Sequence, residues 1–164
     1  MRVFRSKKKW SAAFAGVGVI ATFAAVALGS MGTNFTPTSL VTGTLADNVQ
    51  ANSDRVKFQT KGPTDVRVQN IVFGAGGNSG WHHHPGIVVA TVLSGQVTFT
   101  HSDCSSTTYG QGLAAGSVFV ESGDDPGRAS SVDGATVYAT FVAPHVDPPA
   151  GPIFRIEDAP QPCS

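Results

Sequence analysis

Three consecutive histidines form the most chemically suggestive stretch of this sequence. His82, His83 and His84 follow Trp81 and precede a Pro-Gly turn. In an extended segment alternate side chains point to the same face, so His82 and His84 would face one side and His83 the other. Two imidazoles on one face can bind a single metal ion, and the candidate metals are Fe, Mn, Ni, Cu and Zn. The run is equally compatible with a polar strand end beside a tight turn.

Other catalytic patterns are weak or missing from the sequence. No Gly-x-Ser-x-Gly motif occurs, which argues against an α/β-hydrolase. The Gly-rich residues 74–77 lead into a predicted strand rather than a helix, so they do not predict a phosphate site. The paired acids Asp124-Asp125 and Glu157-Asp158 are typical of solvated loops or tails.

The elements that must position the histidines are predicted to be β-strands. Short runs rich in Val, Phe and Thr alternate with Gly, Asp, Ser and Pro clusters, and no window beyond residue 33 shows helical periodicity. About nine strands with turns between them predict a sandwich or a small barrel. The expected strands are 39–45, 56–60, 65–73, 80–84, 87–93, 96–101, 117–121, 136–142 and 153–157. Residues 144–152 are Pro-rich and are expected to wrap the domain as an extended segment.

The stretch from Gly76 to Gly95 resembles the first motif of the cupin family. That motif is a Gly, five residues, His-x-His, three or four residues, Glu, six residues and Gly, and His82, His84 and Gly95 stand at the matching positions. Gly116 opens a stretch similar to the second motif, which is Gly, five residues, Pro-x-Gly, two residues, His, three residues and Asn. The resemblance covers roughly residues 56–144 and implies an all-β, jelly-roll β-barrel.

The sequence departs from both motifs at the positions that complete the family's metal site. Cupins that hold a metal usually use the two histidines and the Glu of motif one and the His of motif two. Val88 stands at the Glu position and Gly127 at the second-motif His position, while Ser122, Asp124 and Ser131 occupy its Pro, Gly and Asn positions. Only His82 and His84 remain, and a catalytic metal normally has at least three protein ligands.

Several nearby residues could add a ligand or line the pocket. His101, Glu121, Asp124 and Asp125 are the candidate additional ligands, with Asp125 beside the altered His position. Trp81 and Val88 are expected to line the pocket, although such a Trp is more often a packed core residue.

The charge distribution and the N-terminus predict export. Five of the eleven basic residues lie within the first nine positions, and a charge-free apolar stretch from Trp10 to Leu28 follows. This layout is typical of a secretory signal, and its length also permits an uncleaved anchor. The remaining six basic and eleven acidic residues leave an acidic body, which argues against nucleic-acid binding. We therefore expect residues 1–29 as a signal or anchor, 30–45 as a linker and first strand, and 46–164 as the barrel.

Cys104 and Cys163 are the only cysteines. In an exported chain an even pair predicts a disulfide. It would close a loop of about sixty residues and stabilise the fold by about 4 kcal/mol on a chain-entropy estimate.

Three hypotheses about function follow from these observations. The first is an exported barrel that binds a small molecule, with at most a weak or incomplete metal site. The second is a metal-dependent oxygenase or isomerase of the kind that cupins include. The third is a structural or partner-binding envelope protein with a vestigial site. The resemblance to cupins also makes a homodimer one of the expected states. Membrane contact is expected only through the N-terminal segment, if that segment is not cleaved.

Overall fold

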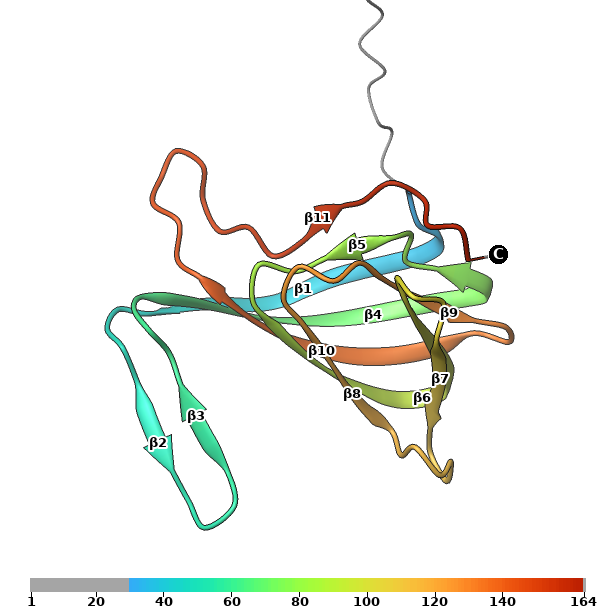
Figure 1. Cartoon of the computed structure of the whole chain (residues 1–164), viewed down its shortest axis with the longest axis horizontal. Helices are drawn as coiled ribbons and strands as arrows, with labels where there is room; N and C mark the ends of the chain where they lie inside the picture. The colour runs from blue at the N-terminus through green and yellow to red at the C-terminus, as the bar shows by residue number, and fades with distance from the viewer. Residues whose placement is uncertain (1–29, 164) are drawn as a thin grey trace, which may run out of the picture.

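The structure, a computed structural model, describes residues 30 to 163, and the predicted signal or anchor at residues 1–29 lies outside them. Within the described residues the chain forms strands and turns, and no helix there is long and apolar enough to cross a membrane. The strands are β1 (Thr33–Leu45), β2 (Gln50–Asn52), β3 (Lys57–Gln59), β4 (Thr64–Asn78), β5 (His82–His83), β6 (Ile87–His101), β7 (Ser106–Gly110), β8 (Val118–Ser122), β9 (Gly127–Ser131), β10 (Ala135–Pro144) and β11 (Ile156–Glu157) (Figure 1).

Nine of these strands form one antiparallel sheet that closes on itself. Strand β4 pairs with β10, β10 with β6, β6 with β9, and β9 with the end of β4 at Gly77 and Asn78. This closure pairs the four ring strands with one another, as in barrels, while β1, β7, β8 and β11 each pair with one neighbour. The prediction of an all-β barrel is confirmed. Strands β2 and β3 form a separate hairpin that projects from the barrel (Figure 1).

The barrel interior follows from strict alternation along the two central strands. Residues 135, 137, 139, 141 and 143 of β10 are buried, and so are residues 88, 90 and 92 of β6, while their neighbours on β6 are exposed. Successive side chains on a strand point to opposite faces, so one face of each strand forms the core. Several of the inward residues are alanines, Ala90, Ala129 and Ala139 among them, and their small side chains leave room inside the barrel.

The observed strands differ from the expected ones at several places, including the unexpected β2 and the shortened β11. Strand β1 begins at Thr33, where a loose polar start was expected, because it pairs with β4 along its length. The two runs around Gly95 form one continuous strand, β6, with Gly95 at a φ of 73°. Strands β7 and β9 lie in polar segments without an apolar run, and they are held by backbone pairing to β6.

The C-terminal segment, residues 145–163, crosses the barrel beside β5 (Figure 1). Its short strand β11 pairs with β5, the Asp158 amide donates to the carbonyl of Trp81, and the Phe154 side chain is buried in the core. Cys163 forms a disulfide with Cys104 in the turn between β6 and β7, as predicted. The segment is therefore fastened at its middle and at its end.

A buried carboxylate connects the start of this segment to the barrel, and it gives a stability prediction. Asp65 is 2% exposed and accepts hydrogen bonds from Thr44 Oγ1 at 2.6 Å and His145 Nδ1 at 2.9 Å. Burial alone would raise the pKa of Asp65, but these hydrogen bonds outweigh it and hold that pKa below its usual value. The hydrogen bond to Asp65 raises the pKa of His145.

We expect Asp65→Asn to lower the free energy of unfolding by about 1–3 kcal/mol, because it removes a charged hydrogen-bond acceptor. The Asp65 contribution is complete above the carboxyl's ordinary pKa of 3.8 and is lost as pH falls through its lower folded value. The His145 contribution is complete below 6.5 and is lost as pH rises through its raised folded value. The free energies of unfolding of the wild type and of Asp65→Asn, measured with urea, should therefore differ most between pH 4 and 6.5.

The control for this prediction is Asp147→Asn. Asp147 lies 3.5 Å from the other ring nitrogen of His145, but its side chain is 95% exposed, so little change in stability is expected. A stability difference between wild type and Asp65→Asn that stays constant from pH 5 to pH 8 would show that the pair does not form.

Candidate metal centre

His82 and His84 face the barrel interior, and each is held by a backbone carbonyl. Both side chains are 5% exposed, whereas His83 points to the other side and pairs with Asp158 at 2.8 Å. The Nδ1 atom of His82 lies 3.0 Å from the Gly80 carbonyl, and that of His84 lies 2.5 Å from the Phe154 carbonyl. A carbonyl only accepts, so each Nδ1 carries the proton and donates it. In a neutral ring held in this way, Nε2 presents its lone pair to the interior.

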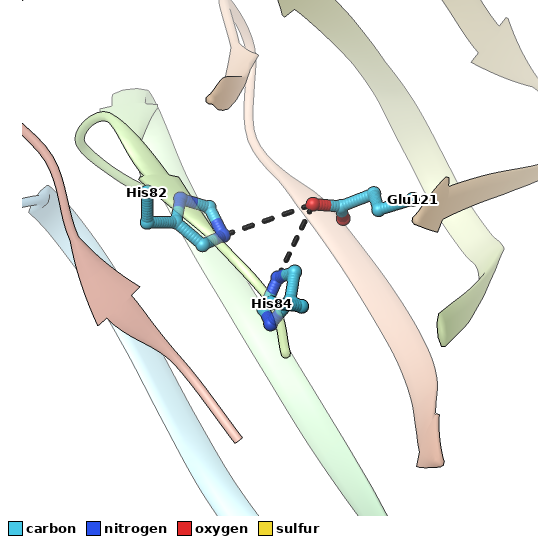
Figure 2. A group of neighbouring side chains, drawn as sticks. All are labelled: His82, His84 and Glu121. Carbon is cyan, nitrogen blue, oxygen red and sulfur yellow. Dashed lines mark ion pairs between the residues drawn. The ribbon is translucent and has the colours of Figure 1, made fainter. Parts of the chain in front are cut away.

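The carboxylate of Glu121 completes the group from a different strand (Figure 2). One of its oxygens, Oε2, lies 3.3 Å from His84 Nε2 and 3.8 Å from His82 Nε2, and the Glu121 side chain is 12% exposed. Strand β8 places Glu121 directly opposite Val88 of β6. Opposed residues in an antiparallel pair share a face of the sheet. The carboxylate thus comes from the strand next to the position at which the motif predicts a glutamate.

The donor set fits a metal ion. The three ligand atoms lie within 4.8 Å of one another, and when both imidazoles are neutral with the proton on Nδ1 all three are acceptors. Converging lone pairs repel one another unless a cation lies between them. Two imidazoles and one carboxylate on one side of an ion are the set that non-haem iron sites use, with further positions left open. The same donors suit other divalent transition metals, so this set does not choose among them.

The surroundings keep His82 in the form that can bind a metal. Burial, and after it the positive charge of Arg155, lowers the pKa of His82 to about 4, and Glu121 opposes these effects only in part. The imidazole is therefore neutral at ordinary pH and its Nε2 lone pair is available. Arg155 itself is held by Glu157 and donates from Nη2 to the Ser79 carbonyl at 2.6 Å.

Gly127 stands at the position of the second-motif histidine, and a core side chain occupies the space that a side chain there would need. A side chain at Gly127 would meet the ring of Phe99, whose nearest atom would lie 2.3 Å from its Cβ. Gly127 is paired with both His82 and His101 on the neighbouring strands. These pairings keep the backbone from moving away from the Phe99 ring. A fourth ligand from this position is thus excluded by packing.

The remaining sequence candidates lie elsewhere. His101 and Asp125 pair with each other at 3.5 Å on an exposed surface, so the structure does not bring them to His82 and His84. Trp81 is buried beneath the guanidinium of Arg128 and does not line the cavity. Val88 does line it.

The three ligand atoms lie on the wall of a cavity of about 450 Å³. This volume is within the range of small-molecule sites. Most of its lining is apolar and comes from the barrel strands and from the C-terminal segment, with Phe35, Ile71, Phe73, Phe119, Phe141, Ile153 and Phe154 as its largest apolar side chains. The polar lining residues other than the three ligands are Arg67, Gln69, Ser79 and Arg155.

Solved structures that include cupin-type proteins are similar to this chain in structure. A Cupin 2 conserved barrel domain protein from Leptotrichia buccalis matches 66% of this chain at 15% identity and a TM-score of 0.46, over 40% of its own length. A salicylate 1,2-dioxygenase from Pseudaminobacter salicylatoxidans matches 46% at 17% identity and a TM-score of 0.40, over 20% of its length. A conserved protein of unknown function from Streptococcus pyogenes matches 68% at 18% identity and a TM-score of 0.47, over 76% of its length.

These likenesses concern the fold and not the reaction, and the chain spans less than half the length of the barrel protein and the dioxygenase. No protein-family model matches the sequence, and no curated protein does.

The sequence pointed to Glu121 only as one of four nearby candidates and did not single it out. The spacing of motif one directs attention to Val88, and the register between β6 and β8 that makes Glu121 equivalent is not visible in that spacing. Phe154, which orients His84 through its carbonyl, was also missed, because a backbone acceptor seventy residues away leaves no mark in the side-chain pattern.

Proposed function

We propose that this protein binds one divalent transition metal through His82, His84 and Glu121 and acts on a small organic molecule held in the adjoining cavity. The observation that carries the proposal is the convergence of two buried imidazoles and the partly buried Glu121 carboxylate on the cavity wall. His82 and His84 alone would favour a simple binding module. The third ligand favours metal-dependent chemistry, because three protein ligands with open positions are the usual catalytic arrangement.

Each residue of the group has a definite task in this proposal. A bound divalent metal would supply a Lewis acid able to polarise an oxygen of the ligand. The carbonyls of Gly80 and Phe154 hold the two imidazoles with Nε2 toward the cavity, and such partners strengthen the ligand and fix its direction. Glu121 supplies the negative charge. The apolar walls exclude water and strengthen every polar contact inside.

We further propose that the protein works outside the cytoplasm. The Cys104–Cys163 disulfide is typical of an oxidising compartment. The basic and apolar N-terminal segment supports the same location.

The test of the proposed function is the metal content of the full chain, produced with its own N-terminal segment and no polyhistidine tag. After incubation with Fe(II), Mn(II), Ni(II), Cu(II) or Zn(II) and removal of the excess, we expect about one equivalent of at least one metal per chain. Chelation should remove it and lower the melting temperature, because an ion that binds only the folded state stabilises it. Failure to retain any of the five metals would contradict the proposal.

A further inference from the structure

Arg67 places a positive charge on the cavity wall. Its Nε donates to Thr42 Oγ1 at 3.1 Å, and its guanidinium lies 4.1 Å from the centre of the Phe154 ring. No aspartate or glutamate between residues 30 and 163 forms an ion pair with it. The other lining arginine, Arg155, is neutralised by Glu157. The two Nη groups of Arg67 are thus free of any acidic partner in that range.

Strand register relates Arg67 to the candidate metal centre. Arg67 of β4 is directly opposite Phe141 of β10, Phe141 is opposite Val88 of β6, and Val88 is opposite Glu121 of β8. These four residues form one row across four neighbouring strands, and all four line the cavity. With strands about 4.8 Å apart, the row measures about 14 Å along the sheet, and the curvature of the barrel shortens the direct path. Arg67 and Glu121 therefore mark the two ends of the row, with an apolar strip between them.

This arrangement selects for the charge of a ligand. A neutral molecule that covered Arg67 would remove water from an unpaired cation, which costs free energy. A carboxylate would replace that water with charge-assisted hydrogen bonds, and its planar geometry matches two parallel N–H groups of a guanidinium. The strip of Phe141 and Val88 between the two ends requires an apolar body.

We propose that the cavity binds a small organic carboxylate by its charged end at Arg67, with its apolar body over Phe141 and Val88. The opposite end of the ligand then faces His82, His84 and Glu121. The inference rests on the proposed function for the role of that end, while recognition of the carboxylate depends on Arg67 alone. Arg67 is thus a specificity-determining residue of the cavity.

The test compares carboxylates with neutral molecules of the same shape. Binding of 3-phenylpropanoate and octanoate, and of their primary amides, would be measured by calorimetry on the full chain. We expect the wild type to bind at least one carboxylate about tenfold or more tightly than its amide, as charged hydrogen bonds of this kind allow. Arg67→Gln should abolish this preference, and Arg67→Lys should restore part of it, because lysine keeps the charge but not the paired donors.

Arg55→Gln is the matched control, because it removes the same charge from a residue whose side chain is 91% exposed on the β2–β3 hairpin. It should leave the preference unchanged. Equal binding of acid and amide to the wild type, binding of neither, or an Arg67→Gln protein that keeps its preference and its wild-type melting temperature would overturn the proposal. Loss of the preference in Arg55→Gln would do so as well.

Each titration is repeated in the presence of a chelator. A carboxylate preference that persists without metal supports recognition by Arg67 whatever the outcome of the metal analysis. A protein that binds metal but does not prefer the carboxylate over its amide would refute the proposed carboxylate recognition and leave the proposed metal site intact. The two proposals can therefore fail separately.

Discussion

Glu121→Val should weaken the binding of a divalent transition metal by about 100-fold or more, and adding Val88→Glu should restore most of the affinity. Mutation of a residue that merely supports a metal ligand costs 10- to 100-fold, so removal of a ligand should cost at least the upper value. The recovery follows from register, because Val88 and Glu121 are opposed on β6 and β8 and both face the cavity. The measurement is a competition titration with a chromophoric chelator.

The exchanged variant should also become dependent on metal for its stability. Val88 is 2% exposed, so a carboxylate placed there lies in an apolar setting unless a cation neutralises it. We therefore expect the Glu121→Val/Val88→Glu protein to gain more melting temperature from added metal than the wild type does. Wild-type affinity in Glu121→Val would show that Glu121 is not a ligand. Failure of Val88→Glu to recover binding in a folded protein would show that the two positions are not equivalent.

The histidine run contains a matched control for this experiment. His83→Ala should retain the metal, because His83 faces away from the cavity and pairs with Asp158. The double variant His82→Ala/His84→Ala should lose it, because one carboxylate alone does not hold a transition metal. A loss of affinity in His83→Ala as large as in the double variant would indicate a general effect of the run on folding rather than coordination.

Removal of the Cys104–Cys163 disulfide should lower the free energy of unfolding by about 4 kcal/mol. The two cysteines are 59 positions apart, and the estimate is the loop-closure entropy that such a crosslink removes from the unfolded chain. Denaturant unfolding of Cys104→Ser/Cys163→Ser against the oxidised wild type measures the change. Reduction of the wild type with a dithiol should reproduce it, and an unchanged unfolding midpoint in both cases would contradict the prediction.

The disulfide also fastens the segment whose Phe154 carbonyl orients His84. Phe154, whose carbonyl accepts the His84 Nδ1 proton, lies between β10 and the cysteine that ends the described chain. We expect the double serine variant to bind metal up to about tenfold more weakly, because burial of Phe154 and pairing of β11 with β5 still hold this carbonyl in place. A larger loss would mean that the crosslink is the main fastening of the segment.

The Phe99–Gly127 contact explains why position 127 adds no fourth side chain to the candidate metal centre. The second-motif histidine and the Phe99 ring would compete for the same space, since a Cβ at position 127 already collides with that ring. A histidine at position 127 would therefore require the core around Phe99 to repack. Val88 stands at the motif-one glutamate position, and the Glu121 carboxylate lies opposite it on the paired strand.

The strands show which parts of the fold the sequence predicts and which it does not. Alternation of apolar residues predicted most of them, because burial on one face imposes a period of two that is visible locally. Strand β9 was missed, since its Gly-Arg-Ala-Ser-Ser sequence has no apolar run and depends on backbone pairing with β6 and β4. The continuity of β6 through Gly95 was missed as well, because a glycine between two apolar runs is typical of a turn. In the structure Gly95 has a positive φ within the strand.

The barrel was implied by the resemblance to cupins. By itself the sequence determined the all-β class, the common face of His82 and His84 and the pairing of the two cysteines. Each of these depends on local spacing or on a count of residues. Only the tertiary structure decided that Glu121 joins the histidines, that His101 and Asp125 do not, and that Phe154 and Arg67 belong to the cavity. The reason is physical: these relations depend on which residues of different strands are opposed, and strand register is set by the packing of the whole barrel.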